Sequence, residues 1–431
     1  MDMKFENTLE FAHSLDIQDP LKNFRDQFYV PILHGKESIY FTGNSLGLQP
    51  KAAQDMVFNE MQDWANFGSE MRMSGKNPWG DYYESFAKRM ANILGTLPEE
   101  VIVMNQLTAN IHLLLTSFYR PSGRRNKIIY EEHAFPSDVY AMQSHVRLAG
   151  LLEEEAMVQI KCRDGESFIC TEDIICAINE CGDELALVFL GGVNYYTGQV
   201  FKMKEITEAA QKVGAKCGFD LAHAAGHVDL QLHKWNVDFA VWCSYKYLNS
   251  GPGAVGGAFI NNKYVTDTNL PRLAGGWGMN KHSRIKNLPT FDAEPTAEGW
   301  QLSGPPVLSM SILKSSLDIF EAAGLDVVVE KSKRLGAYLQ FVLNEINKND
   351  FKILTPQNER EFGCQVSIKV FKNGEHILDI LKKNSVIADW KYSGVIRIAP
   401  TALYNSFQEI FVFGEILKNA FQQNKPKTIN Q

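Results

Sequence analysis

The feature that most constrains this sequence is a series of short apolar runs that alternate with amphipathic segments. The apolar runs are KIIYE at 127–131, LALVFL at 185–190, CGFDLA at 217–222 and VDFAVWCS at 237–244, and the helical pattern MKEITEAAQKVGA lies at 203–215. Short apolar runs are typical of strands buried on both faces of a parallel sheet. Residues 185–222 therefore predict a strand, helix, strand unit. We expect an α/β protein with a mostly parallel sheet between helices.

The pattern changes after residue 305. Long helical stretches at 306–323 and 325–347 are followed by short apolar runs at 351–355, 364–371 and 394–398. This order predicts a smaller α+β domain at 306–431. At 431 residues the chain exceeds one ordinary domain, so we assign 46–305 to a large domain. Residues 1–45 are expected to pack on the small domain.

Charge and hydropathy exclude several classes of protein. Lys and Arg total 43 against 50 Asp and Glu, without a basic block, so we expect no nucleic-acid surface. No apolar run approaches the roughly 18 residues of a membrane span, and the polar, acidic start is unlike a signal peptide. We expect a cytoplasmic protein without membrane association. Seven cysteines without a CxxC pair predict free, mostly buried thiols.

Two charged residues follow neighbouring strands of the predicted sheet. Asp220 lies in the apolar run 217–222, where we expect one strand to end, and Lys246 follows the next run in the string SYKY. The carboxyl ends of parallel strands meet at one edge, where open sheets bind ligands. A pyridoxal phosphate enzyme needs an amine for a Schiff base and a carboxylate that keeps the ring nitrogen protonated. Singly, Asp220 would be a helix N-cap and Lys246 a surface lysine, but together they favour this cofactor.

Other segments supply groups that such a cofactor needs. The helix predicted at 107–118 begins with Leu107 and Thr108, whose main-chain N–H groups and positive helix end suit a phosphate. Thr108 could equally be a simple N-cap. Phe135 follows a strand and could lie on the face of a pyridine ring, although alone it would be a core residue.

Two histidines four residues apart raise the alternative of a metal site. His223 and His227 could face one ion, but the glutamate of HExxH is missing and Gly226 weakens a helix there. We therefore predict no metal, and expect His223 beside the cofactor ring.

A set of rare strings runs along almost the whole chain. They are GNSLGLQP (43–50), NQLTANIHLLL (105–115), HAFPSDVYA (133–141), YYTGQ (195–199), FDLAHAAGH (219–227), WCSYKYLNSGPG (242–253), GGWG (275–278) and IRIAPTALYNSF (396–407). In these strings the chain resembles the kynureninases, pyridoxal phosphate hydrolases of tryptophan catabolism. The resemblance implies the transferase-like fold type I, with a large and a small domain.

The resemblance also implies a role for each residue of the site. Lys246 would form the Schiff base, Asp220 would contact the pyridine nitrogen, and His223 would lie close to the ring. Arg397 would hold the substrate α-carboxylate by a bidentate pair. The other implied cofactor contacts are the phosphate ligands Tyr245, Trp277, Leu107 and Thr108, and the residues that flank the ring, Phe135, Pro136, Ser137 and Asp138.

The implied reaction is hydrolysis of L-kynurenine, or its 3-hydroxy form, to anthranilate or 3-hydroxyanthranilate and L-alanine, on the route to NAD precursors. Lys246 would remove the α-proton, and Tyr245 would either transfer a proton or only bind phosphate. The family further implies a homodimer with shared active sites. The alternatives are another fold type I enzyme, such as an aminotransferase or a cysteine desulfurase using Cys364, and a non-catalytic ligand-binding homologue.

Three positions depart from the family pattern. Arg72 stands where relatives carry a histidine that contacts the aromatic end of the substrate, which leaves the ring-hydroxyl preference open. Gly304 stands before the Pro-Pro step where relatives have a polar side chain, and Gly191 where some have serine. We expect both glycines to reduce side-chain contacts with substrate or phosphate.

Overall fold

The centre of the molecule is a seven-stranded sheet in the order β6-β12-β11-β10-β9-β7-β8. The computed structural model describes residues 4–267, 269–284, 286, 289–391 and 393–423. Apolar side chains bury both faces of the central strands, as expected of a sheet covered by helices. The strands are β6 Val101–Val103, β7 Lys127–Glu131, β8 Met157–Ile160, β9 Leu185–Gly191, β10 Lys216–Asp220, β11 Phe239–Cys243 and β12 Gly256–Ile260.

The sheet is parallel except for one strand. β12 runs antiparallel to both of its neighbours, β11 and β6, so β6 is parallel to the remaining strands. β9 and β10 pair in parallel and are joined through α8, so the strand, helix, strand unit predicted at 185–222 is confirmed. The expectation of a mostly parallel sheet is confirmed as well. β6, β8 and β12 are strands that the apolar pattern did not predict.

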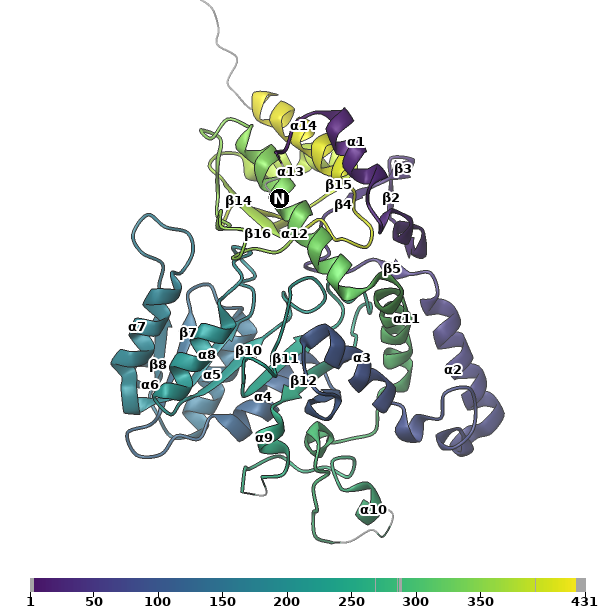
Figure 1. Cartoon of the computed structure of the whole chain (residues 1–431), viewed down its shortest axis with the longest axis vertical. Coiled ribbons are helices and arrows are strands. Elements are labelled where there is room, and N and C mark those ends of the chain that lie inside the picture. Colours follow the sequence, from purple (N-terminus) through teal and green to yellow (C-terminus); the bar gives the residue numbers. More distant parts are fainter. Residues whose placement is uncertain (1–3, 268, 285, 287–288, 392, 424–431) are drawn as a thin grey trace, which may run out of the picture.

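Helices surround the sheet (Figure 1). α8 shows why these sequences form helices, because Met203, Ile206, Thr207 and Ala210 recur at helical spacing and are the buried face. α11 packs alongside α2 at one side of the molecule. The helices of this part are α2 Ala53–Phe67, α3 Glu84–Leu94, α4 Leu107–Phe118, α5 Pro136–Leu148, α6 Glu153–Ala156, α7 Thr171–Cys181, α8 Met203–Lys212, α9 Asn262–Val265, α10 Lys281–Arg284 and α11 Val307–Ala323.

A second apolar core lies above the sheet in Figure 1. It is built on a four-stranded sheet in the order β13-β14-β17-β16. The N-terminal segment contributes to it, because α1 packs on α14 and β4 pairs with β15. The domain boundaries at residues 45 and 305 stay predictions. The elements are α1 Leu9–Ile17, β4 Ile39–Tyr40, α12 Leu325–Asn344, β13 Phe351–Ile353, β14 Val366–Val370, α13 Gly374–Lys383, β15 Val386–Ile387, β16 Asp389–Lys391, β17 Val395–Ile398 and α14 Phe407–Gln423. Two short pairs, β1 Phe28–Tyr29 with β5 Gln49–Pro50 and β2 Ile32–Leu33 with β3 Lys36–Glu37, complete the strands.

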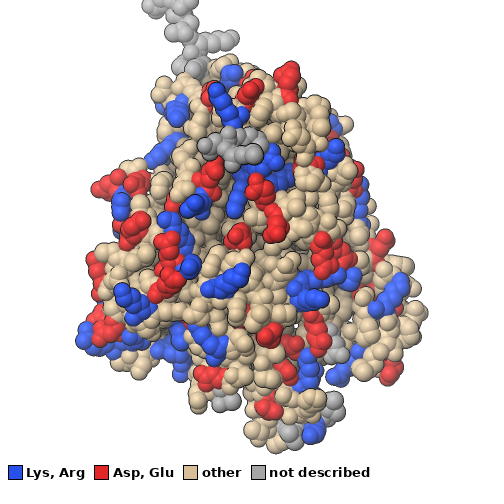
Figure 2. Space-filling view, in the orientation of Figure 1, with Lys and Arg blue, Asp and Glu red and all other residues tan. Residues whose placement is uncertain are grey.

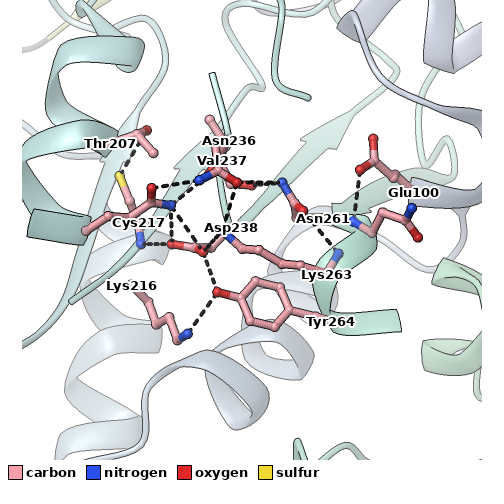
Figure 3. Close-up of polar contacts among 12 residues, drawn as sticks. Glu100, Thr207, Lys216, Cys217, Asn236, Val237, Asp238, Asn261, Lys263 and Tyr264 are labelled. Carbon is pink, nitrogen blue, oxygen red and sulfur yellow. Dashed lines mark hydrogen bonds and ion pairs between the residues drawn. The ribbon is translucent and has the colours of Figure 1, made fainter. Parts of the chain in front are cut away.

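Buried polar residues close the amino edge of the large sheet (Figure 3). Asp238, directly before β11, accepts a hydrogen bond from the main-chain N–H of Cys217 at 2.8 Å and pairs with Lys263 Nζ at 2.8 Å. Glu100, directly before β6, accepts from the N–H of Asn262 at 2.9 Å. Because a buried charge without partners is costly, these contacts fix the strand starts. The candidate site lies at the opposite, carboxyl edge of the sheet.

Acidic and basic side chains are interspersed over the face shown in Figure 2. Within the described ranges, no helix combines the length and apolarity needed to cross a membrane. The seven cysteines are free, but only Cys217, Cys243 and Cys364 are fully buried, so the expectation that most would be buried is wrong. Cys176 is exposed because it lies on the outer face of α7.

Candidate active site

The carboxyl edge of the sheet gathers the predicted residues. β7, β9 and β10 end at Glu131, Gly191 and Asp220, and β11 is followed directly by the Lys246 segment. These strands are parallel, so their ends meet at one edge. β6 shares this direction, which brings the start of α4 to the same edge. The topology alone therefore unites segments that lie more than a hundred residues apart.

Lys246 is buried at this edge, with 7% of its surface exposed. Its Nζ lies 5.7 Å from the ring centre of Phe135 and 5.8 Å from that of Tyr245. Over the described part of the chain, this Nζ has no hydrogen bond or ion pair. The Nζ atom is not one of the fully buried unpaired atoms, so a ligand can reach it at this edge. Lys246 is therefore suited to a covalent or ionic bond with a ligand.

The GNSLG loop packs directly on the lysine segment. The N–H of Gly47 donates to the carbonyl of Tyr245 at 2.8 Å. A Cβ atom at Gly47 would lie 2.3 Å from the carbonyl oxygen of Lys246, so only glycine fits there. Burial raises the pKa of Tyr245, so its hydroxyl keeps its proton. The loop thus fixes the main chain on which Tyr245 and Lys246 stand.

Two buried carboxyl groups share a proton near Lys246. Burial and then the charge of Asp220 raise the pKa of Asp138 well above its ordinary value. Burial also raises the pKa of Asp220, but the charge of Lys246 and the N–H of Ala222, at 2.8 Å from Asp220 Oδ1, oppose that rise. The pKa of Asp138 is therefore raised more strongly than that of Asp220, which favours the proton on Asp138 and the negative charge on Asp220. Such a carboxylate can hold a protonated pyridine nitrogen.

His223 is neutral and unpaired. Burial, followed by the positive charges of Lys246 and Arg397, lowers its pKa well below the ordinary value. Its Nδ1 is buried without a hydrogen-bond partner. In the described residues no group of three or more metal-ligating side chains is found, and His227 Nε2 instead contacts the carbonyl of His223 at 2.7 Å. The two histidines thus do not face one common point.

Arg397 reaches the site from β17 of the smaller sheet. Its Nη1 donates to the carbonyl of Tyr195 at 2.8 Å, and its Nη2 donates to Ser45 Oγ at 3.1 Å and to Asp389. The guanidinium carbon lies 5.7 Å from the Tyr195 ring centre, and that ring is 6.3 Å from the His223 ring. Nε of Arg397 is buried without a partner. The guanidinium is therefore held in place while its Nε–H donor stays unused.

The start of α4 offers main-chain donors. The N-cap is Gln106, and Thr108 is the second helical residue, so the alternative that Thr108 is a simple N-cap is wrong. Asn110 is the residue whose N–H bonds back to Gln106, at 3.1 Å, and the preceding N–H groups of Leu107 and Thr108 point out of the helix end. This end can bind an anion. Pro136 and Ser137 open α5 beside it, on the same edge.

Trp277 belongs to a separate aromatic cluster. Its ring centre lies 5.5 Å from that of Trp79, and the Arg72 guanidinium lies 5.9 Å from the Trp277 ring. A Cβ atom at Gly304 would be 3.2 Å from this ring. Two of the three departures from the family pattern therefore adjoin Trp277. The third, Gly191, adjoins Glu131, to which its N–H donates at 3.0 Å.

Three residues of the edge were missed by the sequence reasoning. Glu131 ends β7, and burial raises its pKa to about 7, although the hydrogen bond from the N–H of Gly191 opposes that rise. The strand-end rule that identified Asp220 could have found Glu131. Tyr195 lies in the string YYTGQ, which carried the resemblance without an assigned role. Asp389 had no local signal, because only the tertiary fold brings it to Arg397.

The chain is similar to known proteins in sequence and in fold. A profile of the kynureninase C-terminal domain matches residues 328–417. A kynureninase of Flavobacterium psychrophilum is 53% identical, covering 98% of this chain and 100% of the relative. A kynureninase of Nematostella vectensis is 41% identical, covering 97% and 95%.

Solved structures extend the likeness to the fold. The apo cysteine desulfurase of Thermococcus onnurineus has a TM-score of 0.73 at 20% identity, covering 90% of this chain and 95% of that one. A C-DES mutant with glycine covalently linked to the PLP cofactor has a TM-score of 0.73 at 16% identity, covering 88% and 96%. These likenesses confirm fold type I and concern the fold alone. By its full-length relatives, the chain belongs to the kynureninase family.

Proposed function

We propose that this protein is a kynureninase, which hydrolyses L-kynurenine or 3-hydroxy-L-kynurenine to anthranilate or 3-hydroxyanthranilate and L-alanine. In a cell this reaction serves tryptophan catabolism and the synthesis of NAD precursors. The observation that carries the proposal is the buried residue Lys246, whose charge acts on the buried carboxyl group of Asp220, in a chain with kynureninase relatives over its full length.

The carboxyl edge fits pyridoxal 5'-phosphate. Two groups there have no hydrogen-bond partner: the buried Nδ1 of His223 and the amine of Lys246, a residue with 7% of its surface exposed. Asp220 would hold the ring nitrogen, Phe135 with the rest of the segment 135–138 would flank the ring, and the start of α4 with Tyr245 would bind phosphate. When bound, this cofactor withdraws electrons from the α-carbon and then from the β-carbon of the substrate.

Residues of the chain bind the substrate and transfer the protons of the reaction. Arg397 binds the α-carboxylate and orients the amino acid. The freed amine of Lys246 takes the proton from the α-carbon and returns it, acting as acid and base in turn. Water adds to the γ-carbonyl, the bond between the β- and γ-carbons breaks, and the β-carbon takes up a proton. Tyr245 holds its proton and can donate here, or it can serve only as a phosphate ligand.

The desulfurase alternative is weakened by the state of Cys364. A desulfurase needs a mobile, reactive thiol near the lysine. Cys364 is fully buried, and burial raises the pKa of its thiol to about 12. Its Sγ lies 3.5 Å from Nδ1 of His227, within the protein core. The reactive set of Asp220, Lys246 and Arg397 likewise opposes the non-catalytic alternative.

The active form is expected to be a homodimer with shared sites. α2 exposes large apolar side chains, including Phe58 at 60% and Trp64 at 62%, an unusual surface for a monomer. The Trp277 cluster lies near the groove of about 470 Å³ lined by Trp64, Trp79 and Gly304. We infer that Trp277 of each subunit reaches the phosphate of its neighbour's site. Location in the cytoplasm is part of this proposal.

The test is product analysis with both substrates. The purified protein and pyridoxal phosphate are incubated with L-kynurenine and, separately, with its 3-hydroxy form, and aromatic acid and alanine are quantified. Equimolar product pairs support the proposal. The relative rates with the two substrates show whether an enzyme with Arg72 prefers the ring with or without the 3-hydroxyl group. If neither pair forms while the cofactor remains bound, the proposal fails, and cysteine and amino-acceptor substrates are the next to try.

A further inference from the structure

A buried cluster outside the reacting groups joins three segments of the active site. His227 has 1% of its surface exposed and lies four residues after His223, within the turns that follow β10. Its ring contacts that of Tyr247 in a tilted arrangement, with centres 3.9 Å apart and an interplanar angle of 33°. Its Nδ1 lies 3.5 Å from both the main-chain nitrogen and the Sγ of Cys364. His227 therefore contacts Tyr247, which follows Lys246 in the sequence, and Cys364, which lies just before β14.

The hydrogen bonds fix the state of the His227 ring. Its Nε2 lies 2.7 Å from the carbonyl oxygen of His223, which can only accept, so Nε2 carries the proton. Nδ1 is then the acceptor for the N–H of Cys364. Burial lowers the pKa of His227 to about 4, which keeps the ring neutral at physiological pH.

The fit around this ring is close. A Cβ atom at Gly363 would lie 2.5 Å from Cε1 of His227, so the segment before Cys364 can approach only as glycine. The carbonyl that His227 holds belongs to His223, whose own side chain has an unpaired Nδ1 at the candidate cofactor site. Tyr247, whose ring contacts that of His227, is the residue next to Lys246. A displacement of the His227 ring would thus move both residues that face the cofactor.

We propose that His227 is a positioning residue for the Lys246 site, which holds the main chain of His223 through Nε2–H and ties it to Tyr247 and to the 363–364 segment. This inference rests on the proposed function. It predicts that cofactor binding depends more on the Nε2–H donor than on the shape of the ring. Without the donor, the carbonyl of His223 would lose the hydrogen bond that holds its turn in place. His227 touches neither substrate nor cofactor in this role.

Three variants separate the donor from the ring. His227→Phe keeps an aromatic ring on Tyr247 and loses the donor, His227→Gln keeps an N–H that can reach the His223 carbonyl, and His227→Asn is too short to reach it. The matched control is Gln340→Met, which removes another buried side-chain N–H bond to a main-chain carbonyl, that of Pro356 at 3.0 Å. This control lies in the second core, away from the site.

Cofactor affinity and the absorbance spectrum of bound pyridoxal phosphate are measured without substrate, followed by kcat and KM for kynurenine. We expect His227→Phe to lower cofactor affinity and kcat roughly tenfold, as loss of a buried hydrogen bond would, with KM within about threefold. His227→Gln should restore both, and Gln340→Met should change thermal stability alone.

Two results would overturn the proposal: wild-type spectrum, cofactor affinity and kcat in folded His227→Phe, or a His227→Gln that is as defective as Phe. If the Phe variant does not fold, the Asn and Gln variants give the same comparison, and equal behaviour of these two refutes the role of the donor. A wild-type protein that forms no alanine from kynurenine would overturn the proposed function instead, since the substrate-free spectra still report on His227.

Discussion

Replacement of Asp138 tests the proton assignment at the carboxyl edge. Burial and the charge of Asp220 raise the pKa of Asp138 well above its ordinary value, so we expect Asp138 to be protonated and to donate to Asp220; its Oδ1 is buried without a partner. Asp138→Asn keeps a donor of the same size, whereas Asp138→Ala removes it. A hydrogen bond to a charged group contributes roughly 1.5–3 kcal/mol. We therefore expect Ala to lower kcat/KM roughly 10- to 150-fold and Asn to stay within about threefold of wild type.

The assay is the initial rate of anthranilate release from kynurenine at pH 8, together with titration of pyridoxal phosphate into the apoprotein. Asp220→Asn is the comparison, because the same change there removes the negative charge and should be far more damaging. If Asp138 carried the charge instead, its Asn variant would be as defective as its Ala variant. Equal loss in these two variants would therefore refute the assignment.

The remaining predictions concern the proposed carboxylate-binding residue Arg397, the buried acid Glu131 and the proposed contact of Trp277 with the neighbouring subunit's site. Arg397→Lys loses the planar fork, so KM for kynurenine should rise at least about tenfold with a smaller change in kcat, and an unchanged KM would contradict the carboxylate role. Burial raises the pKa of Glu131 to about 7, from an ordinary value of 4.5 in the unfolded chain. The protonated side chain therefore contributes its full free energy of stabilisation below pH 4.5, and this contribution is lost as the pH rises through 7. Between pH 6 and 8 this loss is about 1 kcal/mol, and urea unfolding of Glu131→Gln should show that loss abolished; an equal pH dependence in both proteins would refute it. Mixing inactive Lys246→Ala and Trp277→Ala subunits should recover about a quarter of wild-type activity if sites are shared, whereas activity equal to the average of the two separate variants would argue against sharing.

The strand ends of the sheet were predictable because their signal is local. Asp220 and Lys246 each follow an apolar run, and parallel pairing brings the ends of such runs together. Glu131 is the last residue of β7 just as Asp220 is of β10, and the same rule could have identified it. The β6 and β12 strands escaped prediction because Val101–Val103 is very short and GGAFI begins with glycines, which disfavour strands.

Contacts between the two cores were beyond the sequence. Arg397 was identified from its string, but its bonds to Ser45 and the main chain of Tyr195 join residues about 350 and 200 positions away. No periodicity records such pairings, because they depend on how the smaller sheet sits against the larger one. The same holds for His227, whose role depends on Cys364 approaching from the start of β14.

The most direct test of the central claim is hydrolysis in water labelled with ¹⁸O. The proposed reaction adds water to the γ-carbonyl, so anthranilate should gain ¹⁸O in its new carboxylate and alanine should form in equal amount, while Lys246→Ala should form neither. Conversion of kynurenine to a 2-oxo acid with its carbon skeleton intact, or full activity in Lys246→Ala, would contradict the account.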